Sequence, residues 1–326
     1  MSTPTRIKTR IFILSDTLDF NYFSPKAGVL NLPLPKSDIL LHCGDLTEYG
    51  DLPSLKKALQ MLALIPAELK LVIPGNHDLS LDHDFCARQD MDQGNRERNV
   101  GGATKWMELH EQAIELMTQS DEVKRADVTY LTEGTHRFVL RSGTVVRVYA
   151  NPYTPYPEAS EPWAFQYRRD QDRFNLLPED AGDGKHSIAT NPVPDGEANI
   201  DIIMTHGPPR GILDECQIGN IGCENLLRAV SRARPSLLAH GHVHAGAGGM
   251  AISWDRDRKM RGDDATVWRE RLQNPFPGAV EMGNAKSEGR SGEETLIVNA
   301  SIMGDGYKAR NKPWIVDLYL TTQEEA

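Results

Sequence analysis

Carboxylate, amide and imidazole side chains recur along the sequence, each directly after a short apolar run. They are Asp16, Asp45, Asn76, His206, His242 and His244. Taken singly each has an ordinary explanation, because an aspartate after a strand is often a helix N-cap and Asn or His near Gly and Pro often completes a turn. Taken together, oxygen and nitrogen ligands without a thiolate suit Mn²⁺, Fe or Zn²⁺. The pattern therefore predicts a centre for one or two divalent ions.

Residues 237–244 carry the densest part of this pattern. His240, His242 and His244 alternate around Gly241. If the chain is extended there, alternate side chains point to the same side, so two or three imidazoles could reach one ion. A hydrogen-bonded turn at the end of a strand would explain the same residues.

Such a centre has a definite chemistry. Two aspartates beside several histidines need compensating positive charge, which divalent cations supply. A carboxylate that bridges two ions ~3.5–4 Å apart would polarise a phosphoryl oxygen and lower the pKa of a bound water, giving hydroxide near neutral pH. The predicted reaction is hydrolysis of a phosphoester.

An α/β sheet is required to bring these residues together. Apolar runs predict buried strands at 11–14, 39–43, 69–73, 200–205 and 237–244, and further strands at 128–131, 137–140, 145–149, 296–301 and 314–319. Helical spacing of apolar residues predicts helices at 53–64, 103–119 and 224–233. Because ligands bind at the carboxyl ends of strands in such sheets, we expect the polar residues to share one edge.

The remaining segments are predicted to be irregular. Residues 82–102 and 170–197 are polar and are interpreted as a loop and a connector, and 151–162 as a rigid loop rich in proline and aromatics. The aromatic rings there either pin the loop to the core, which we favour, or form the floor of a substrate pocket. Residues 251–292 are strongly charged and are predicted to be a surface insertion, with a short helix at 267–272, in a single domain spanning 1–326.

Composition limits the partners. The 326 residues carry a formal net charge of −10, which argues against a long nucleic acid but not against a small anionic substrate held by metal ions. The four cysteines form no C-x-x-C pair, no apolar stretch approaches the ~18 residues of a membrane span, and no apolar region typical of a signal peptide follows Met1. We expect a cytoplasmic protein with an anionic small-molecule substrate and no membrane partner. The sequence predicts no oligomeric state.

The motifs resemble those of the calcineurin-like metallophosphoesterases, in particular the small eukaryotic branch typified by brain metallophosphoesterase-domain proteins. The matching segments are Ser15-Asp16-Thr17, His42-Cys43-Gly44-Asp45-Leu46-Thr47, Gly75-Asn76-His77-Asp78-Leu79, Thr205-His206-Gly207-Pro208-Pro209, Gly211-Ile212-Leu213-Asp214, Gly241-His242-Val243-His244 and Val298-Asn299-Ala300-Ser301. The resemblance implies a four-layer αββα sandwich with two metal ions at the strand ends.

The resemblance also assigns roles to residues. Asp45 would bridge the two ions, and the first ion would also be bound by Asn76, His206 and His242. Asp16 and His244 would bind the second ion. His77 would be the catalytic histidine that steers or protonates the leaving oxygen, and Asp78 would orient it.

The sequence departs from the family pattern at one position. The first motif of the family has a histidine two residues after its aspartate, whereas this chain has Leu18. Asp19 could substitute, although its side chain would leave the strand end in a different direction. The chain is therefore expected to be a hydrolase of a small phosphomonoester or of a phosphodiester such as a cyclic nucleotide. The alternatives are a mononuclear metalloenzyme acting on a small organic acid or a natural-product intermediate, and a catalytically weak metal-binding protein.

Overall fold

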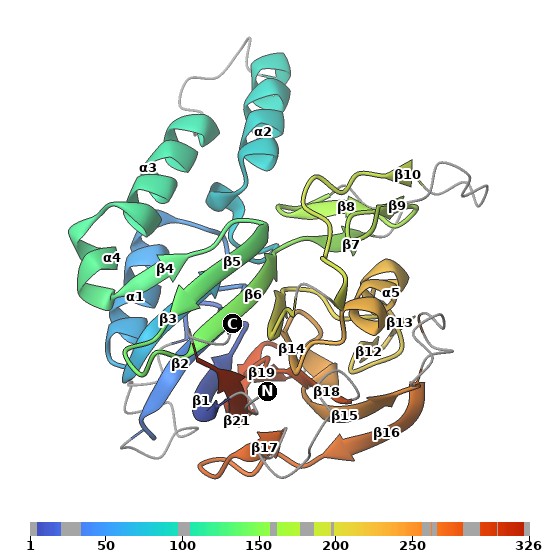
Figure 1. The fold of residues 1–326 in the computed structure, drawn as a ribbon. Helices are drawn as coiled ribbons and strands as arrows, with labels where there is room; N and C mark the ends of the chain where they lie inside the picture. The colour runs from blue at the N-terminus through green and yellow to red at the C-terminus, as the bar shows by residue number, and fades with distance from the viewer. Residues whose placement is uncertain are drawn as a thin grey trace.

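Two large β-sheets face each other in the computed structural model, with helices on both outer faces (Figure 1). The structure describes residues 5–20, 34–96, 105–156, 162–176, 186–196, 199–255, 262, 266–282, 294–304 and 306–322. None of the helices in these ranges is both long and apolar enough to cross a membrane.

The first sheet has six strands, and β1 to β4 within it are parallel. In spatial order they are β17 (Val280–Met282), β21 (Trp314–Thr321), β1 (Arg6–Leu14), β2 (Ser37–Cys43), β3 (Ala67–Ile73) and β4 (Val128–Tyr130). Strand β21 runs antiparallel to β1. The parallel strands all end at the same edge, which is where Asp16, Asp45 and Asn76 follow.

The second sheet has seven strands, with a parallel centre and antiparallel strands at both edges. In spatial order they are β16 (Thr266–Leu272), β15 (Gly248–Trp254), β18 (Glu294–Asn299), β14 (Leu237–His240), β11 (Ile202–Thr205), β6 (Val145–Asn151) and β5 (Gly134–Val139). Short two-stranded pairs lie outside the large sheets: β7 (Thr154–Tyr156) with β8 (Gln166–Arg168), β9 (Gln171–Asp172) with β10 (His186–Ser187), β12 (Glu215–Cys216) with β13 (Gly219–Asn220), and β19 (Met303–Gly304) with β20 (Lys308–Ala309).

Helices cover the outer faces. They are α1 (Leu52–Ala63), α2 (His83–Arg96), α3 (Trp106–Thr118), α4 (Asp121–Ala126) and α5 (Glu224–Ala233), with 3₁₀ turns η1 (Leu79–Leu81) and η3 (His244–Gly246). Alternate residues of β1 face different layers: Phe12 and Leu14 pack with α1 and α3, whereas Ile11 and Ile13 pack against the second sheet. Helix α5 packs on the far face of the second sheet. The predicted αββα sandwich is confirmed.

Two local predictions were wrong. Residues 82–102 were expected to be a loop, but 83–96 form α2, because Asp82 accepts hydrogen bonds from the N–H groups of Asp84 (2.9 Å) and Phe85 (3.2 Å) and caps the helix. The helix expected at 267–272 is part of strand β16, since Gly249 to Trp254 of β15 pair with it along its length. Residues 256–261, 263–265 and 283–292 of the predicted insertion lie outside the described residues.

Candidate metal centre

The predicted ligands lie side by side at the carboxyl ends of five strands, three in the first sheet and two in the second. Asp16 follows β1, Asp45 and Asn76 follow β2 and β3, and His206 and His242 follow β11 and β14 of the other sheet. Backbone hydrogen bonds hold these ends together, from the N–H of Asp16 to Gly44 O (2.9 Å) and from the N–H of Gly241 to His206 O (3.0 Å). Residues separated by more than two hundred positions thus meet at a common edge, as the sequence predicted.

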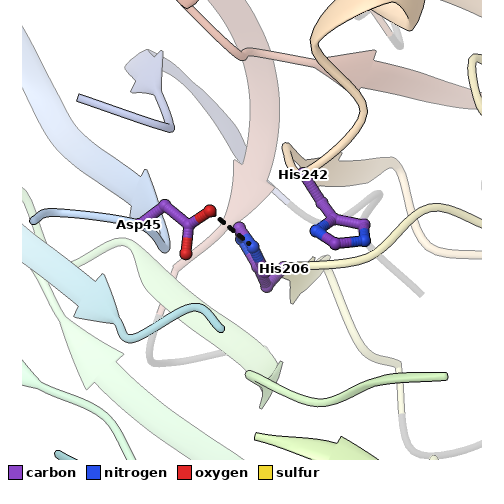
Figure 2. A group of neighbouring side chains, drawn as sticks. All are labelled: Asp45, His206 and His242. Carbon is purple, nitrogen blue, oxygen red and sulfur yellow. Dashed lines mark ion pairs between the residues drawn. The ribbon is translucent and has the colours of Figure 1, made fainter. Parts of the chain in front are cut away.

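Four candidate ligands lie close together at this edge. His206 Nε2 lies 3.2 Å from Asp45 Oδ2 and 3.1 Å from Asn76 Oδ1. The imidazole of His242 joins them, because ligand atoms of Asp45, His206 and His242 all lie within 4.8 Å of one another (Figure 2). This group, Asp45, Asn76, His206 and His242, is called the first metal position below.

The first metal position has the hydrogen bonding expected of a metal site. His206 Nδ1 lies 2.8 Å from Cys43 O, which holds a proton on Nδ1 and leaves Nε2 as the ligand atom. Burial lowers the pKa of His206, but the carboxylates of Asp45 and Asp16 outweigh burial and raise it to about 9. In the metal-free chain a proton therefore supplies the positive charge that the carboxylates require. The donor set fits a divalent cation.

Asp16 and His244 form a second group, called the second metal position. His244 Nε2 lies 3.3 Å from Asp16 Oδ1, and the N–H of His242 donates to both carboxylate oxygens of Asp16, at 3.0 and 3.1 Å. Burial raises the pKa of Asp16, but His244 and His206 outweigh burial and keep that pKa below its usual range. This position offers one carboxylate and one imidazole, and Asp45 as the predicted bridge.

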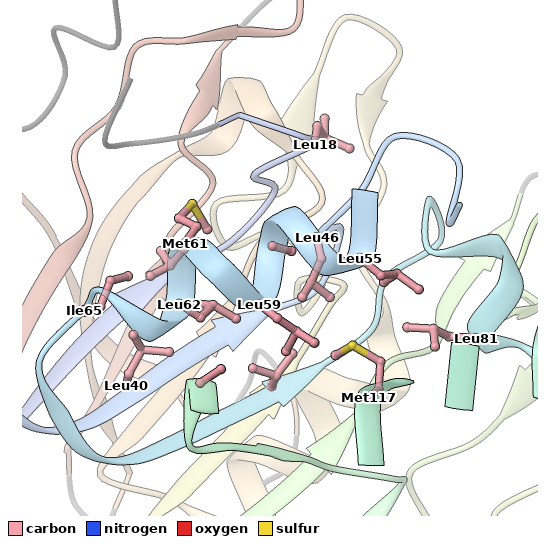
Figure 3. Packing of buried hydrophobic residues seen from close by; sticks show 14 of the residues in the cluster. Leu18, Leu40, Leu46, Leu55, Leu59, Met61, Leu62, Ile65, Leu81 and Met117 are labelled. Atoms are coloured by element: carbon pink, nitrogen blue, oxygen red, sulfur yellow. The ribbon is translucent and has the colours of Figure 1, made fainter. Parts of the chain in front are cut away.

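Leu18 does not face either metal position as a ligand. It is 9 % exposed and belongs to the hydrophobic cluster between the first sheet and α1, lying at the margin of that cluster (Figure 3). Its N–H donates to Asp45 O at 3.1 Å, which fixes the backbone rather than the side chain. Asp19, considered as a replacement ligand, is exposed.

His77 lies beside the first metal position, and its backbone N–H donates to Asp45 Oδ1 at 2.8 Å. Its ring is oriented by Glu48 rather than by Asp78: Nδ1 lies 3.0 Å from Glu48 O. The role predicted for Asp78 was therefore wrong, because its carboxylate accepts instead from the N–H groups of Leu46, Thr47 and Gly75 at 2.9 to 3.1 Å. Asp78 ties the loop after β2 to the loop after β3.

Three candidate ligands have the left-handed backbone conformation, with φ of 55° at Asp16, 53° at Asp45 and 67° at His242. Such conformations are uncommon outside glycine and cost of order 1–3 kcal/mol where they are strained. Gly75 and Gly241 provide space beside them, since an added Cβ would overlap the carboxylate of Asp45 or of Asp16, respectively. The local backbone is shaped around the two carboxylates.

The histidines at 237–244 reach the site by a turn and not by continued strand. Strand β14 ends at His240, His242 is left-handed and His244 lies in η3. His240 is fully buried with Nδ1 3.2 Å from Gly241 O, and burial lowers its pKa to about 4. The alternation argument was therefore wrong in its geometry, although His242 and His244 do contribute.

A hollow of about 420 Å³ opens over the first metal position and is lined by Asp45, Asn76, His77, His242, His244 and Tyr307, among others. The Tyr307 ring lies 5.0 Å from that of His244, and the exposed Trp163 ring lies 4.8 Å from that of His77. Sequence reasoning missed Tyr307, which follows a glycine-rich turn without a recognisable motif. Of the aromatic residues directly after the predicted loop, Phe165 and Tyr167 are buried in the core, as favoured, whereas the exposed Trp163 contacts His77.

His42, for which no role of its own was predicted from the sequence, is buried directly behind the site. Its Nε2 lies 3.0 Å from Thr17 Oγ1, which in turn donates to Leu46 O at 3.1 Å. These contacts join the loop that carries Asp16 to the loop that carries Asp45. The signal in the sequence was its position at the end of a buried strand, directly before Cys43 and Gly44.

Comparison with known proteins agrees with this geometry. Residues 9–246 match the model of the calcineurin-like phosphoesterase family. Metallophosphoesterase domain-containing protein 1 of Homo sapiens is 30% identical over 226 residues, which are 68% of this chain and 58% of that protein. Probable rhamnogalacturonate lyase C of Emericella nidulans is 30% identical over 225 residues, 68% of this chain and 17% of that protein.

A crystal structure of phosphopantetheinyl hydrolase from Mycobacterium tuberculosis aligns with 82% of this chain and 97% of that chain, at 12% identity and a TM-score of 0.40. The matches span less than two thirds of the length of the two curated relatives. The family match covers most of the chain and contains all six predicted ligands. The chain belongs to the calcineurin-like phosphoesterase family, whose members use divalent metal ions.

Proposed function

We propose that the chain hydrolyses a small anionic phosphoester, either a phosphodiester such as a cyclic nucleotide or a phosphomonoester, with one or two ions of Mn, Fe or Zn. The observation that carries this proposal is that Asp45 and Asn76 both lie within about hydrogen-bond distance of His206 Nε2, beside His77. Ions bound there would neutralise charge on the phosphoryl oxygens and activate a water molecule as nucleophile.

The residues around the hollow have distinct roles in the proposed reaction. His206 is held by Cys43 O and Asp45 by the N–H of His77, so both present their ligand atoms without reorganisation. With Nδ1 of His77 bonded to Glu48 O, its Nε2 is the nitrogen available to give a proton to a leaving oxygen. Trp163 packs edge-on against the His77 ring and limits its rotation.

The hollow also supports a small anionic substrate. Among its lining residues that the structure describes there is no lysine or arginine, so metal ions must supply the positive charge for a phosphate. A volume of about 420 Å³ accommodates a small molecule, and the acidic chain disfavours a long nucleic acid. We further propose a cytoplasmic location without a membrane partner. The four cysteines are unpaired, which supports a reducing compartment.

The experiment is to strip the purified chain of metal, reload it with Mn²⁺ and measure both bound metal and product release. The substrates are bis(p-nitrophenyl) phosphate, p-nitrophenyl phosphate and a cyclic nucleotide. We expect metal-dependent release and, in His77→Asn, a loss of about 10²–10⁴-fold with metal content retained. The matched control is His186→Asn, an exposed histidine remote from the site. A metal-loaded chain that acts on none of these esters would refute the proposal.

A further inference from the structure

A second hollow adjoins the one over the metal centre. It has a volume of about 380 Å³ and its lining includes Asp214, Glu215, Gly246 and Arg271. Cys216 and Ala245 line both hollows, so the two hollows adjoin, and together they are called the groove below. The groove runs from the metal centre along the β12–β13 hairpin, which lies between α5 and the β15–β16 edge of the second sheet (Figure 1), to Arg271 on β16.

Arg271 is placed to receive an anion at the far end of this groove. It pairs with Met250 across β15 and β16, and its guanidinium lies over Gly248, where an added Cβ would be 3.5 Å from Nη2. Within the described ranges it has no hydrogen bond or ion pair with another residue. It is also the only arginine or lysine among the described residues that line either hollow.

The charged residues near Arg271 differ from it in their contacts. Arg269 has the same orientation on β16 but donates to Gly211 O at 3.3 Å. The buried carboxylate of Asp214 accepts from the N–H groups of Gly211 (3.0 Å) and Gly222 (2.9 Å), so it holds the loop and is not free to pair with Arg271. Glu215 lines the groove as an exposed carboxylate.

The middle of the groove is apolar. Val243 and Ala245 from the turn after β14 face Cys216 and Ile218 from the β12–β13 hairpin. The side chain of Ile218 is 80% exposed, although an isoleucine is among the residues most often buried. An apolar segment of a ligand would cover it and gain free energy from the contact.

We propose that the groove selects a substrate with two anionic groups: a phosphoester at the metal centre, an apolar connecting segment, and a second phosphate or a carboxylate bound by Arg271. This inference rests on the proposed function and specifies its substrate class. A guanidinium binds either anion in a bidentate manner, so the shared chemistry is that of a planar or tetrahedral oxyanion. Arg271 acts as a specificity residue and takes no part in the reaction.

The test uses the Mn²⁺-loaded protein and two series of probes, alkane-1,ω-bisphosphates of increasing length and the corresponding alkyl monophosphates. We expect the bisphosphates to be preferred at one chain length, and Arg271→Ala to lower kcat/KM for that bisphosphate by about 10–100-fold through KM, with monophosphate hydrolysis unchanged. Arg271→Lys should recover part of the preference, because charge remains while the bidentate geometry is lost.

The matched control is Arg137→Ala, which removes one exposed arginine from β5, the opposite edge strand of the same sheet. The inference would be overturned, with the proposed function intact, if the wild type hydrolysed the two probe series at equal rates. The same holds if Arg271→Ala kept the preference for the bisphosphate. An equal loss in Arg137→Ala would show a general charge effect and would overturn it as well. Release of phosphate from neither series would overturn this inference, and the proposed function would fall with it only if the protein also hydrolysed no phosphodiester.

Discussion

The first metal position combines four candidate ligands, two of them oriented by backbone groups, whereas the second has only the pair of Asp16 and His244 with the predicted bridge. His206 in the first position is oriented by Cys43 O, and Asp45 by the N–H of His77. The residue two positions after Asp16 is Leu18, which is part of the hydrophobic core. Leu18 therefore offers the second position no ligand atom.

Ligand geometry and core packing are coupled at this edge. The N–H of Leu18 donates to Asp45 O, so its backbone supports the site while its side chain packs in the core. Asp16 remains fully buried and needs His244 and the N–H of His242 to compensate its charge. The two positions should therefore differ in metal affinity, and the following experiments compare them directly.

The largest effect is expected from the first position. His206→Ala removes an imidazole that contacts both Asp45 and Asn76, so the first ion should be lost. Because changes to residues that only orient a ligand cost 10–100-fold in metal affinity, removal of a ligand should cost more than about 100-fold. Metal analysis after dialysis, with His186→Ala as the control, measures this loss. Full metal content in His206→Ala would show that the assigned ligands are wrong.

His244→Gln tests the second position separately. Glutamine keeps a hydrogen-bond donor for Asp16 but is a poor metal ligand, so the fold should be preserved and only the second ion should leave. Because His244 is itself an assigned ligand, we expect a loss of more than about 100-fold in affinity for the second ion, with the first ion retained. Titration with Mn²⁺ monitored by calorimetry distinguishes the two sites. If His244→Gln also loses the first ion, the two positions are not independent.

Leu18→His should restore the missing donor. We expect stronger binding of the second ion and an increase in phosphodiester hydrolysis of about tenfold, equivalent to about 1.4 kcal/mol of transition-state stabilisation. The metal-free variant should be less stable, by roughly 1–3 kcal/mol, because an imidazole replaces an apolar side chain in the core. Leu18→Gln, which shares the stability cost without the imidazole, is the matched control. Equal rates in the two variants would contradict a role for the lost histidine.

The affinity of the first metal position for an ion should depend on pH. Because the pKa of His206 is raised to about 9 in the metal-free chain, an ion in the first position must displace a proton at neutral pH. Affinity should therefore increase with pH between 6 and about 9, by up to about tenfold per pH unit, and level off above that range. His242 needs no deprotonation, because burial and the charge of His206 lower its pKa to about 3. A Mn²⁺ affinity that is constant from pH 6 to 8 would contradict this charge arrangement.

The sequence predicted the fold and the first position because both depend on regular rules. Buried strands end in polar residues, parallel strands end at one edge, and the edge gathers Asp45, Asn76 and His206 whatever the intervening loops do. The motifs identified the family for the same reason, since they lie in the strand-end loops.

What the sequence did not predict depends on contacts between distant segments. Helix α2 is mostly polar and shows little apolar periodicity, but its Asp90 accepts hydrogen bonds from the N–H groups of Trp106 (2.8 Å) and Met107 (3.0 Å) at the start of α3. Strand β16 is charged, yet pairing with β15 determines its conformation. Glu48 O at the His77 ring and Tyr307 beside His244 belong to loops, where no periodic pattern indicates which groups meet.

The left-handed backbone at Asp16 and Asp45 limits how these positions can evolve. Aspartate tolerates that conformation better than most residues because its short side chain can bond locally, whereas glutamate offers the same carboxylate on a chain that does not. Replacement by glutamate would therefore displace the oxygen atoms and strain the peptide at the same time. Selection at the two strand ends acts on the shape of the main chain as well as on charge, which makes the aspartates harder to exchange than ligands held on regular helices.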